Sequence, residues 1–200
     1  MVADLNARII IDAILSAIKH QTDFGFSLKS GCQTILAGYS QRGQTSLATF
    51  RAIQDKIPTE LVSLINLKKC YSKAGPHNLE ATMKIYLDEW KDKAISPLIY
   101  LILKGMLSAD YDFLSAYTMH DFIKDEFFNS SLKTHLDQKN VKLNGIINSQ
   151  ELALKFSYYS DIENLLKPDA LDPTFPLFKA LEKALRINNI SSGWTVKMIS

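Results

Sequence analysis

The first third of the chain alternates between two hydrophobic periods. Residues 3–20 repeat apolar side chains every three or four positions, which predicts a surface helix that covers a core. Two runs predict strands: the uncharged TILAGY, residues 34–39, expected to be buried, and LVSLINLKKC, residues 61–70, with helical spacing between them up to Pro58. This order predicts a βαβ unit with two parallel strands. The stripe expected to face the core in the first helix consists of Leu5, Ile9, Ala13 and Ala17 with Ile10, Ile14 and Ile18.

The pattern becomes helical after the second strand. GPHNLEATMKIYLDEWKDK, residues 75–93, opens with Pro76 and predicts one helix, and a second is expected over 97–108. Shorter helices are expected within 111–137 and 149–166, and a last helix over 176–188. The predicted fold class is α/β, with about two parallel strands, flanking helices and a mostly helical segment.

Composition limits both the size and the partners of this fold. Two hundred residues with 46% hydrophobic side chains suffice for one ordinary core, or for one core with a helical appendage. The 23 basic and 21 acidic side chains leave a formal charge of +2, which argues against binding nucleic acid. The N-terminus lacks the features of a signal peptide, and the most apolar stretch, residues 97–107, is about half as long as a membrane span requires. We therefore expect a soluble protein.

Cysteine content and short motifs predict neither a metal site nor a cofactor. Cys32 and Cys70 are the only cysteines, too few for a disulfide framework or a zinc site. If residues 34–39 and 62–69 pair as parallel neighbours, Cys32 precedes the start of one segment and Cys70 follows the end of the other. Their expected separation is then about 20 Å, beyond disulfide reach. Two free thiols are expected. No Gly-rich phosphate loop or CxxC motif is present.

Ser40 lies where the first predicted strand turns into the following helix, within TILAGYSQRGQTSLATF. A strand, a sharp turn and a helix form the context in which some enzymes present a nucleophilic serine. Such a turn needs small residues two positions before and two positions after the serine. Gly38 meets the first need, whereas Arg42 occupies the second position and Gly43 follows it. Two interpretations stay open: a nucleophile, or a helix N-cap whose hydroxyl accepts a backbone N–H.

The segment LAGYSQRGQTSLA resembles the nucleophile elbow of the α/β-hydrolase superfamily, most closely its secreted lipase- and peptidase-like esterases. Those enzymes often have Gly-Tyr-Ser-Gln-Gly-Gly at this point. AGPHNLEATM, residues 74–83, is similar to the segment after their next strand, and ISSGWTVKMIS, residues 190–200, to the approach to the strand that carries their acidic triad residue. The resemblance implies that residues 1–76 are a partial hydrolase core, 77–188 a helical cap and 189–200 the approach to a further core strand.

The resemblance also assigns roles to the residues of the turn. It implies that Ser40 is the nucleophile and that the backbone N–H of Gln41 donates to the oxyanion. The other residues of the elbow are Gly38, Tyr39, Arg42 and Gly43. In this family an acidic residue and then a histidine follow the serine, and the resemblance places both beyond Ser200. We therefore expect a truncated hydrolase, an internal piece that is inactive alone.

Histidines inside the chain are the alternative source of a base. His77, His120 and His135 follow Ser40, but nothing in their spacing places an imidazole against its hydroxyl. We interpret them as ordinary surface histidines, and His20 as a favourable charge at a helix end. Side chains of the helical segment suit an acyl-binding cavity or, by preference, an ordinary core: Met83, Met106, Met119, Leu101, Ile102, Leu107 and Tyr111. A solvated loop explains Lys68, Lys69 and Lys73.

Three functional hypotheses follow. The first is a serine esterase or lipase-like hydrolase that acts on a small ester or acyl substrate through Ser40. The second is a non-catalytic interaction protein, which would pair through exposed strand edges with its own copies or with a complementing chain. The third is a gene fragment without activity. The sequence leaves the localisation undetermined.

Overall fold

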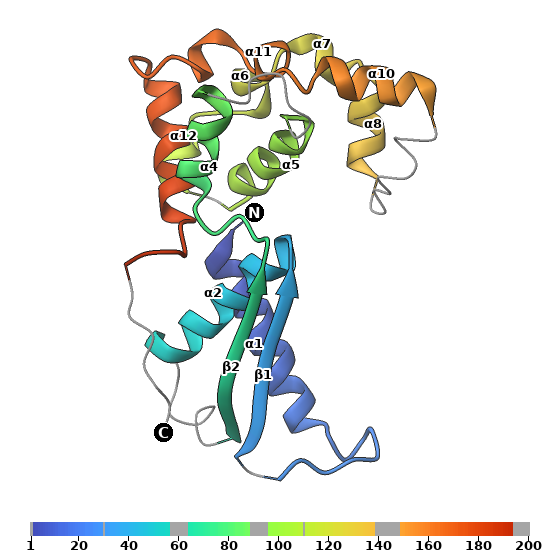
Figure 1. Cartoon of the computed structure of the whole chain (residues 1–200), viewed down its shortest axis with the longest axis vertical. Helices are drawn as coiled ribbons and strands as arrows, with labels where there is room; N and C mark the ends of the chain where they lie inside the picture. The colour runs from blue at the N-terminus through green and yellow to red at the C-terminus, as the bar shows by residue number, and fades with distance from the viewer. Residues whose placement is uncertain are drawn as a thin grey trace. The chain divides into compact units, whose positions relative to one another are not determined.

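The computed structural model describes residues 2–29, 31–56, 64–88, 96–109, 111–138 and 149–193. These residues form ten α-helices, two short 3-10 helices and a two-stranded parallel sheet, so the protein is of mixed α/β class (Figure 1). They divide into two compact units. The strand unit comprises Val2–Leu79 with residues 188–193, and the helical unit comprises Glu80–Ile187. The sequence predicts boundaries after residues 76 and 188, and residues 194–200 of the last predicted segment lie outside the described part.

The strand unit has the element order that the hydrophobic pattern predicts. Helix α1 spans Ala3–Lys19, strand β1 Cys32–Tyr39, helix α2 Gln41–Lys56 and strand β2 Ile65–Lys73. The two strands are parallel, as expected. Strand β2 extends three residues further than predicted because its ladder with β1 continues to the pair Tyr39 and Lys73.

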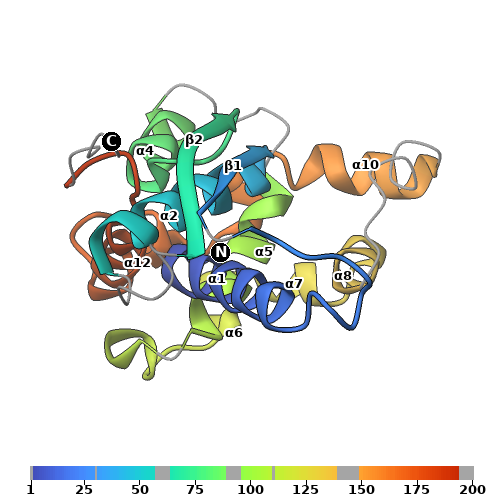
Figure 2. The same cartoon turned by 90° about the horizontal axis from the view of Figure 1, so that it is seen from below.

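One face of the sheet carries the core of the strand unit. Both views show α1 and α2 on the same side of the strands (Figures 1 and 2). The core cluster contains Phe50 and Ile53 of α2 with Ile65 and Leu67 of β2, and Ile11, Ile14, Ile18, Leu36 and Cys70 pack against it. On the other face, Ile35, Tyr39 and Tyr71 are 56%, 66% and 57% exposed. The expectation of a fully buried strand is therefore wrong: within the strand unit, no described element covers this second face.

The buried stripe of α1 agrees only in part with the expected one, since Ile14 and Ile18 pack against the core as predicted but Ala13 and Ala17 are exposed. Leu5 and Ile9 are exposed, whereas Ala3 and Ala7 are buried against Ala48 of α2 and Ile190. Three consecutive isoleucines at 9–11 make the helix apolar on more than one side, so its pattern does not select a single face. The small alanine side chains permit close packing of α1 on α2, and this packing decides which stripe is buried.

A bulge in β2 places adjacent lysines on the surface. Thr34 pairs with Leu67 and Ile35 with Lys69, so Lys68 is an extra residue in the ladder. Both lysines and Lys73 are exposed. They lie within the strand rather than in the predicted loop.

The cysteines are both free, as expected. Their predicted placement is wrong because each lies within a strand. Cys32 opens β1, and Cys70 pairs with Leu36, four residues further along that strand. This offset corresponds to about 13 Å along the sheet, which still excludes a disulfide. Burial raises the pKa of the Cys70 thiol, which disfavours its reactive thiolate.

The helical unit contains the remaining helices. Helix α5, predicted over 97–108, spans Ser96–Leu107, and α12, predicted over 176–188, spans Pro176–Ile187. The other elements are α4 (Leu79–Asp88), which begins in the strand unit, η1 (Asp112–Leu114), α6 (Met119–Phe122), α7 (Asp125–Phe128), α8 (Ser131–Asp137), α10 (Gln150–Tyr158), α11 (Ile162–Leu165) and η2 (Pro168–Ala170). Among the described helices, none has both the length and the apolar character needed to cross a membrane.

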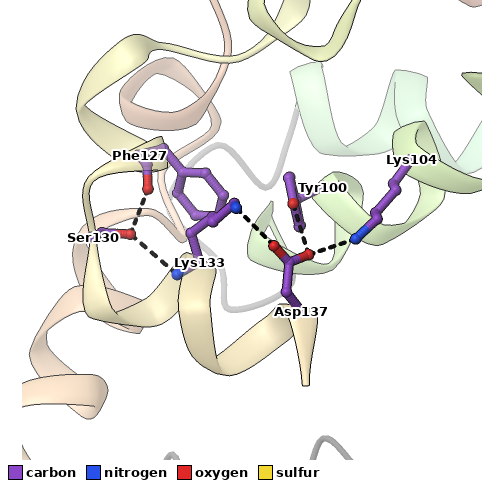
Figure 3. A network of polar contacts seen from close by, with 6 residues as sticks. All are labelled: Tyr100, Lys104, Phe127, Ser130, Lys133 and Asp137. Carbon is purple, nitrogen blue, oxygen red and sulfur yellow. Dashed lines mark hydrogen bonds and ion pairs between the residues drawn. The ribbon is translucent and has the colours of Figure 1, made fainter. Parts of the chain in front are cut away.

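A polar network joins α5 to α8 within the helical unit (Figure 3). The Asp137 carboxylate accepts hydrogen bonds from Tyr100 Oη at 2.8 Å and Lys104 Nζ at 2.7 Å, and it pairs with Lys133 Nζ at 2.8 Å. Burial acts to raise the pKa of Asp137, but these three donors outweigh it and lower the pKa from 3.8 to about 2. The network thus holds a charged carboxylate whose partners are all in place.

Candidate active site

The turn between β1 and α2 consists of a single residue, Ser40. Strand β1 ends at Tyr39 and α2 begins at Gln41. Ser40 has a φ of 57°, in the left-handed region that costs a non-glycine residue about 1–2 kcal/mol. Its N–H donates to the carbonyl of Lys73 at 2.9 Å, which ties the turn to the end of β2. Strained backbone of this kind concentrates at functional sites and persists only where the surroundings enforce it.

Two glycines allow the first turn of α2 to approach the strands. A Cβ at Gly38 would overlap the carbonyl of Arg42 and would lie 2.5 Å from Ser46 Oγ. A Cβ at Gly43 would lie 2.8 Å from the carbonyl oxygen of Lys73. Arg42 itself is exposed. The collision that the sequence predicts two positions after Ser40 therefore does not occur, because the close approach falls on Gly43 instead.

The hydroxyl of Ser40 is exposed, and among the described residues it has no hydrogen-bond partner. The first N–H groups of α2 that fold back onto Ser40, those of Gly43 and Gln44, donate to its backbone carbonyl at 2.9 and 3.3 Å. The side-chain N-cap interpretation lacks its hydrogen bond in this arrangement. The N–H of Gln41, at the start of the helix, is likewise without a described partner and is available to an oxyanion.

A buried amide lies one turn into the same helix. Gln44 is fully buried, and neither its Oε1 nor its Nε2 has a hydrogen-bond partner among the described residues. Most buried polar groups are paired. Unsatisfied polarity therefore lies close to the strained turn.

None of the four histidines forms a hydrogen bond with Ser40 Oγ among the described residues. His20 pairs with Asp23 at 2.9 Å, and the exposed His120 pairs with Asp125 at 3.2 Å. His135 belongs to α8 of the helical unit, and its buried Nε2 has no described partner. Of the four histidines, only His77 belongs to the loop after β2, at the end of the sheet where both strands terminate and where Ser40 lies.

His77 contacts a serine that the sequence analysis did not single out. Its Nε2 lies 2.5 Å from Ser72 Oγ, and Ser72 Oγ donates to the carbonyl of Gly43 at 2.8 Å. The signal that could have identified Ser72 is the pair Lys68–Lys69. Two adjacent charged residues interrupt the alternation of a strand and indicate a bulge, after which every later side chain, that of Ser72 included, lies on the opposite face.

Two of the side chains considered for an acyl-binding cavity lie in the core of the described chain. Met83 and Met106 are 8% and 0% exposed and belong to the core, as the preferred interpretation has it. A depression of about 350 Å³ in the helical unit is lined by other residues: Lys124, Glu163, Leu166, Pro168, Leu171 and Asp172. In the described part of the chain, no group of three or more His, Cys, Asp or Glu side chains is arranged to hold a metal ion.

Comparison with known proteins finds no matching family model, no matching curated protein and no matching solved structure. The geometry of the turn therefore carries the functional argument by itself.

Proposed function

We propose that this chain presents Ser40 as the nucleophile of a serine ester hydrolase, in a strand–turn–helix elbow like that of α/β hydrolases. The observation that carries the proposal is the left-handed backbone of Ser40 at the carboxyl end of β1, fixed to the Lys73 carbonyl and flanked by two glycine contacts. A serine in an ordinary turn needs neither this strain nor an unbonded, exposed hydroxyl.

The chemistry follows from the groups around the turn. Ser40 Oγ attacks the ester carbonyl carbon as a base removes its proton, and the N–H of Gln41 donates to the oxyanion that forms. Expulsion of the alcohol leaves an acyl-serine, which water then hydrolyses. Because no described imidazole contacts Oγ, the proposed base reaches Ser40 on assembly with a second copy of this chain. In this proposal the helical unit has the role of a cap.

Labelling with a fluorophosphonate probe tests the proposal directly, since the probe reacts only with an activated serine. The full chain is labelled over a range of protein concentrations, and the modified peptide is identified by mass spectrometry. We expect modification at Ser40 that Ser40→Ala abolishes. Ser108→Ala, which removes an exposed serine of the helical unit, serves as the matched control and leaves labelling unchanged.

Two results would overturn this assignment. One is a chain that unfolds cooperatively yet takes up no probe at any concentration. The other is labelling that persists in Ser40→Ala. Labelling that rises with protein concentration supports a base supplied in trans, whereas labelling at every dilution supports one supplied within the chain.

A second candidate function is a non-catalytic interaction protein, which the open face of the sheet favours. Parallel sheets are usually covered on both faces, whereas here Ile35, Tyr39 and Tyr71 are exposed. A chain of this kind would associate through that face and the strand edges. Sedimentation of the wild type and of a Tyr71→Ser variant tests whether the chain associates through this face. A wild type that stays monomeric contradicts association.

A further inference from the structure

The loop after β2 is locked onto the first turn of α2. Ala74 has a φ of 52°, so the chain bends sharply at the end of the strand. A Cβ at Gly75 would lie 2.6 Å from the backbone nitrogen of Gln44 and 2.6 Å from His77 Nε2. The N–H of His77 donates to the carbonyl of Gly75 at 2.8 Å, and its carbonyl accepts the N–H of Ile190 at 2.9 Å. His77 is therefore held from both sides.

Proton counting fixes the direction of the hydrogen bonds around Ser72. A hydroxyl has one proton, and the Gly43 carbonyl can only accept, so the contact of 2.8 Å requires Ser72 Oγ to donate to it. The remaining lone pairs of Oγ then face His77 Nε2 at 2.5 Å. This second contact is favourable only if Nε2 carries a proton. Both contacts are satisfied together only when His77 donates to Ser72 and Ser72 donates to Gly43.

The bulge makes this relay possible. Ser72 pairs with Gly38 and shares the helix-facing side of the sheet with Cys70, which packs against the core. Without the extra residue Lys68, the strand alternation would direct Ser72 to the open face. Because Gly38 has no side chain, α2 comes close enough for the Gly43 carbonyl to reach the hydroxyl.

We propose that Ser72 and His77 are positioning residues for the Ser40 turn, acting as a relay from His77 Nε2–H through Ser72 Oγ–H to the Gly43 carbonyl. The relay holds the first turn of α2 in place, directly after the residue whose strained backbone it must maintain. In its neutral form His77 is the Nε2–H tautomer, and Nδ1 carries the lone pair. The catalytic benefit of this positioning rests on the proposed hydrolase function, whereas the tautomer and the rigidity of the turn do not.

Nitrogen NMR of the full chain, with the imidazole neutral, tests the relay without reference to activity. We expect His77 Nε2 to resonate as a protonated nitrogen and Nδ1 as an unprotonated one, and Ser72→Ala to weaken this preference. Amide exchange at Ser40 gives a second readout. It should become about 10-fold faster in Ser72→Ala and in His77→Phe, while Ser72→Thr, which keeps the hydroxyl, restores slow exchange.

The relay is overturned if His77 is the Nδ1–H tautomer, or if Ser40 exchanges at the wild-type rate in a folded Ser72→Ala variant. If Ser72→Ala does not fold, two other measurements test the relay. They are the His77 tautomer in the wild type and the amide exchange of Ser40 in His77→Gln, which keeps an N–H donor and should keep exchange slow. Fluorophosphonate labelling should slow about 10-fold in Ser72→Ala, since a displaced nucleophile loses orientation. An unlabelled wild type with the expected tautomer and exchange rates would refute the hydrolase function and leave the relay intact.

Discussion

The Ser40 turn and the Asp137 network differ in whether their polar groups have hydrogen-bond partners. At Ser40 the backbone is left-handed, and among the described residues neither its hydroxyl nor the nearby buried Gln44 amide has a hydrogen-bond partner. The Asp137 carboxylate, in contrast, forms hydrogen bonds and ion pairs with a tyrosine hydroxyl and two ammonium groups. Groups that stabilise a fold are normally satisfied, whereas strain and unsatisfied polarity gather where a protein acts on something else. The left-handed backbone of Ser40 directs the search for function to the strand unit, because an unpaired buried group by itself also occurs in the helical unit, at His135 Nε2.

Filling the space beneath the Ser40 turn should lower the stability of the protein more than any other change considered. Gly38→Ala forces a Cβ into the backbone of α2 at Arg42, so we expect the free energy of unfolding to fall by about 3 kcal/mol or more. Chemical denaturation measures the loss. Gly25→Ala is the control, because no atom lies within 4 Å of its Cβ position and only its φ of 74° opposes the change, at about 1 kcal/mol. Equal losses in the two variants would contradict the close approach of helix and strand.

Asp137→Asn should have a smaller effect, confined to the helical unit. The partners Lys104 and Lys133 are partly exposed, so we expect a loss of about 1 kcal/mol near neutral pH. Because the folded-state pKa of Asp137 lies below its ordinary value, at about 2, its carboxylate stabilises the fold above about pH 4. That contribution disappears as the pH falls through about 2. Urea denaturation from pH 6 to pH 2 should show the free energies of unfolding of the wild type and of Asp137→Asn converging. A difference that stays constant over this range would contradict the lowered pKa of Asp137.

Ser40→Gly should stabilise the protein while it abolishes any nucleophile. Glycine adopts a φ of 57° without steric cost, so we expect a gain of about 0.5–1 kcal/mol after the greater entropy of the unfolded glycine chain is included. Ser40→Ala keeps the strain and should show no such gain. Thermal unfolding of both variants measures the difference. A destabilised Ser40→Gly would mean that the serine side chain itself supports the turn.

Ile35→Thr on the open face of the sheet should have the smallest effect, within about 0.5 kcal/mol. Leu36→Thr, at the next position but packed on the core, should cost about 1–3 kcal/mol. Equilibrium denaturation compares the pair at low protein concentration. A large loss for Ile35→Thr would show that the open face is covered in solution.

Much of the strand unit is predictable from local signals. The helical period of residues 3–20, the uncharged strand before Ser40 and the break at Pro58 give the element order correctly. The position of Ser40 at the turn follows from the same signals. Its left-handed backbone does not, because serine has no intrinsic preference for that region and adopts it only under the constraint of the Lys73 hydrogen bond and the glycine contacts.

The arrangement of side chains around the turn required the pairing of distant segments. The sequence by itself determined the α/β class, the element order and the room that the glycine two residues before Ser40 leaves at the turn. Periodicity, turn residues and the lack of a side chain act within a few positions along the chain, so they can be recognised without the fold. Tertiary structure alone decided the buried stripe of α1, the open face of β1 and the contact of Ser72 with His77. The last of these depends on one extra residue, Lys68, in the ladder. A shift of one residue reverses the face of every later side chain, and only the pairing of two strands fixes where that shift occurs.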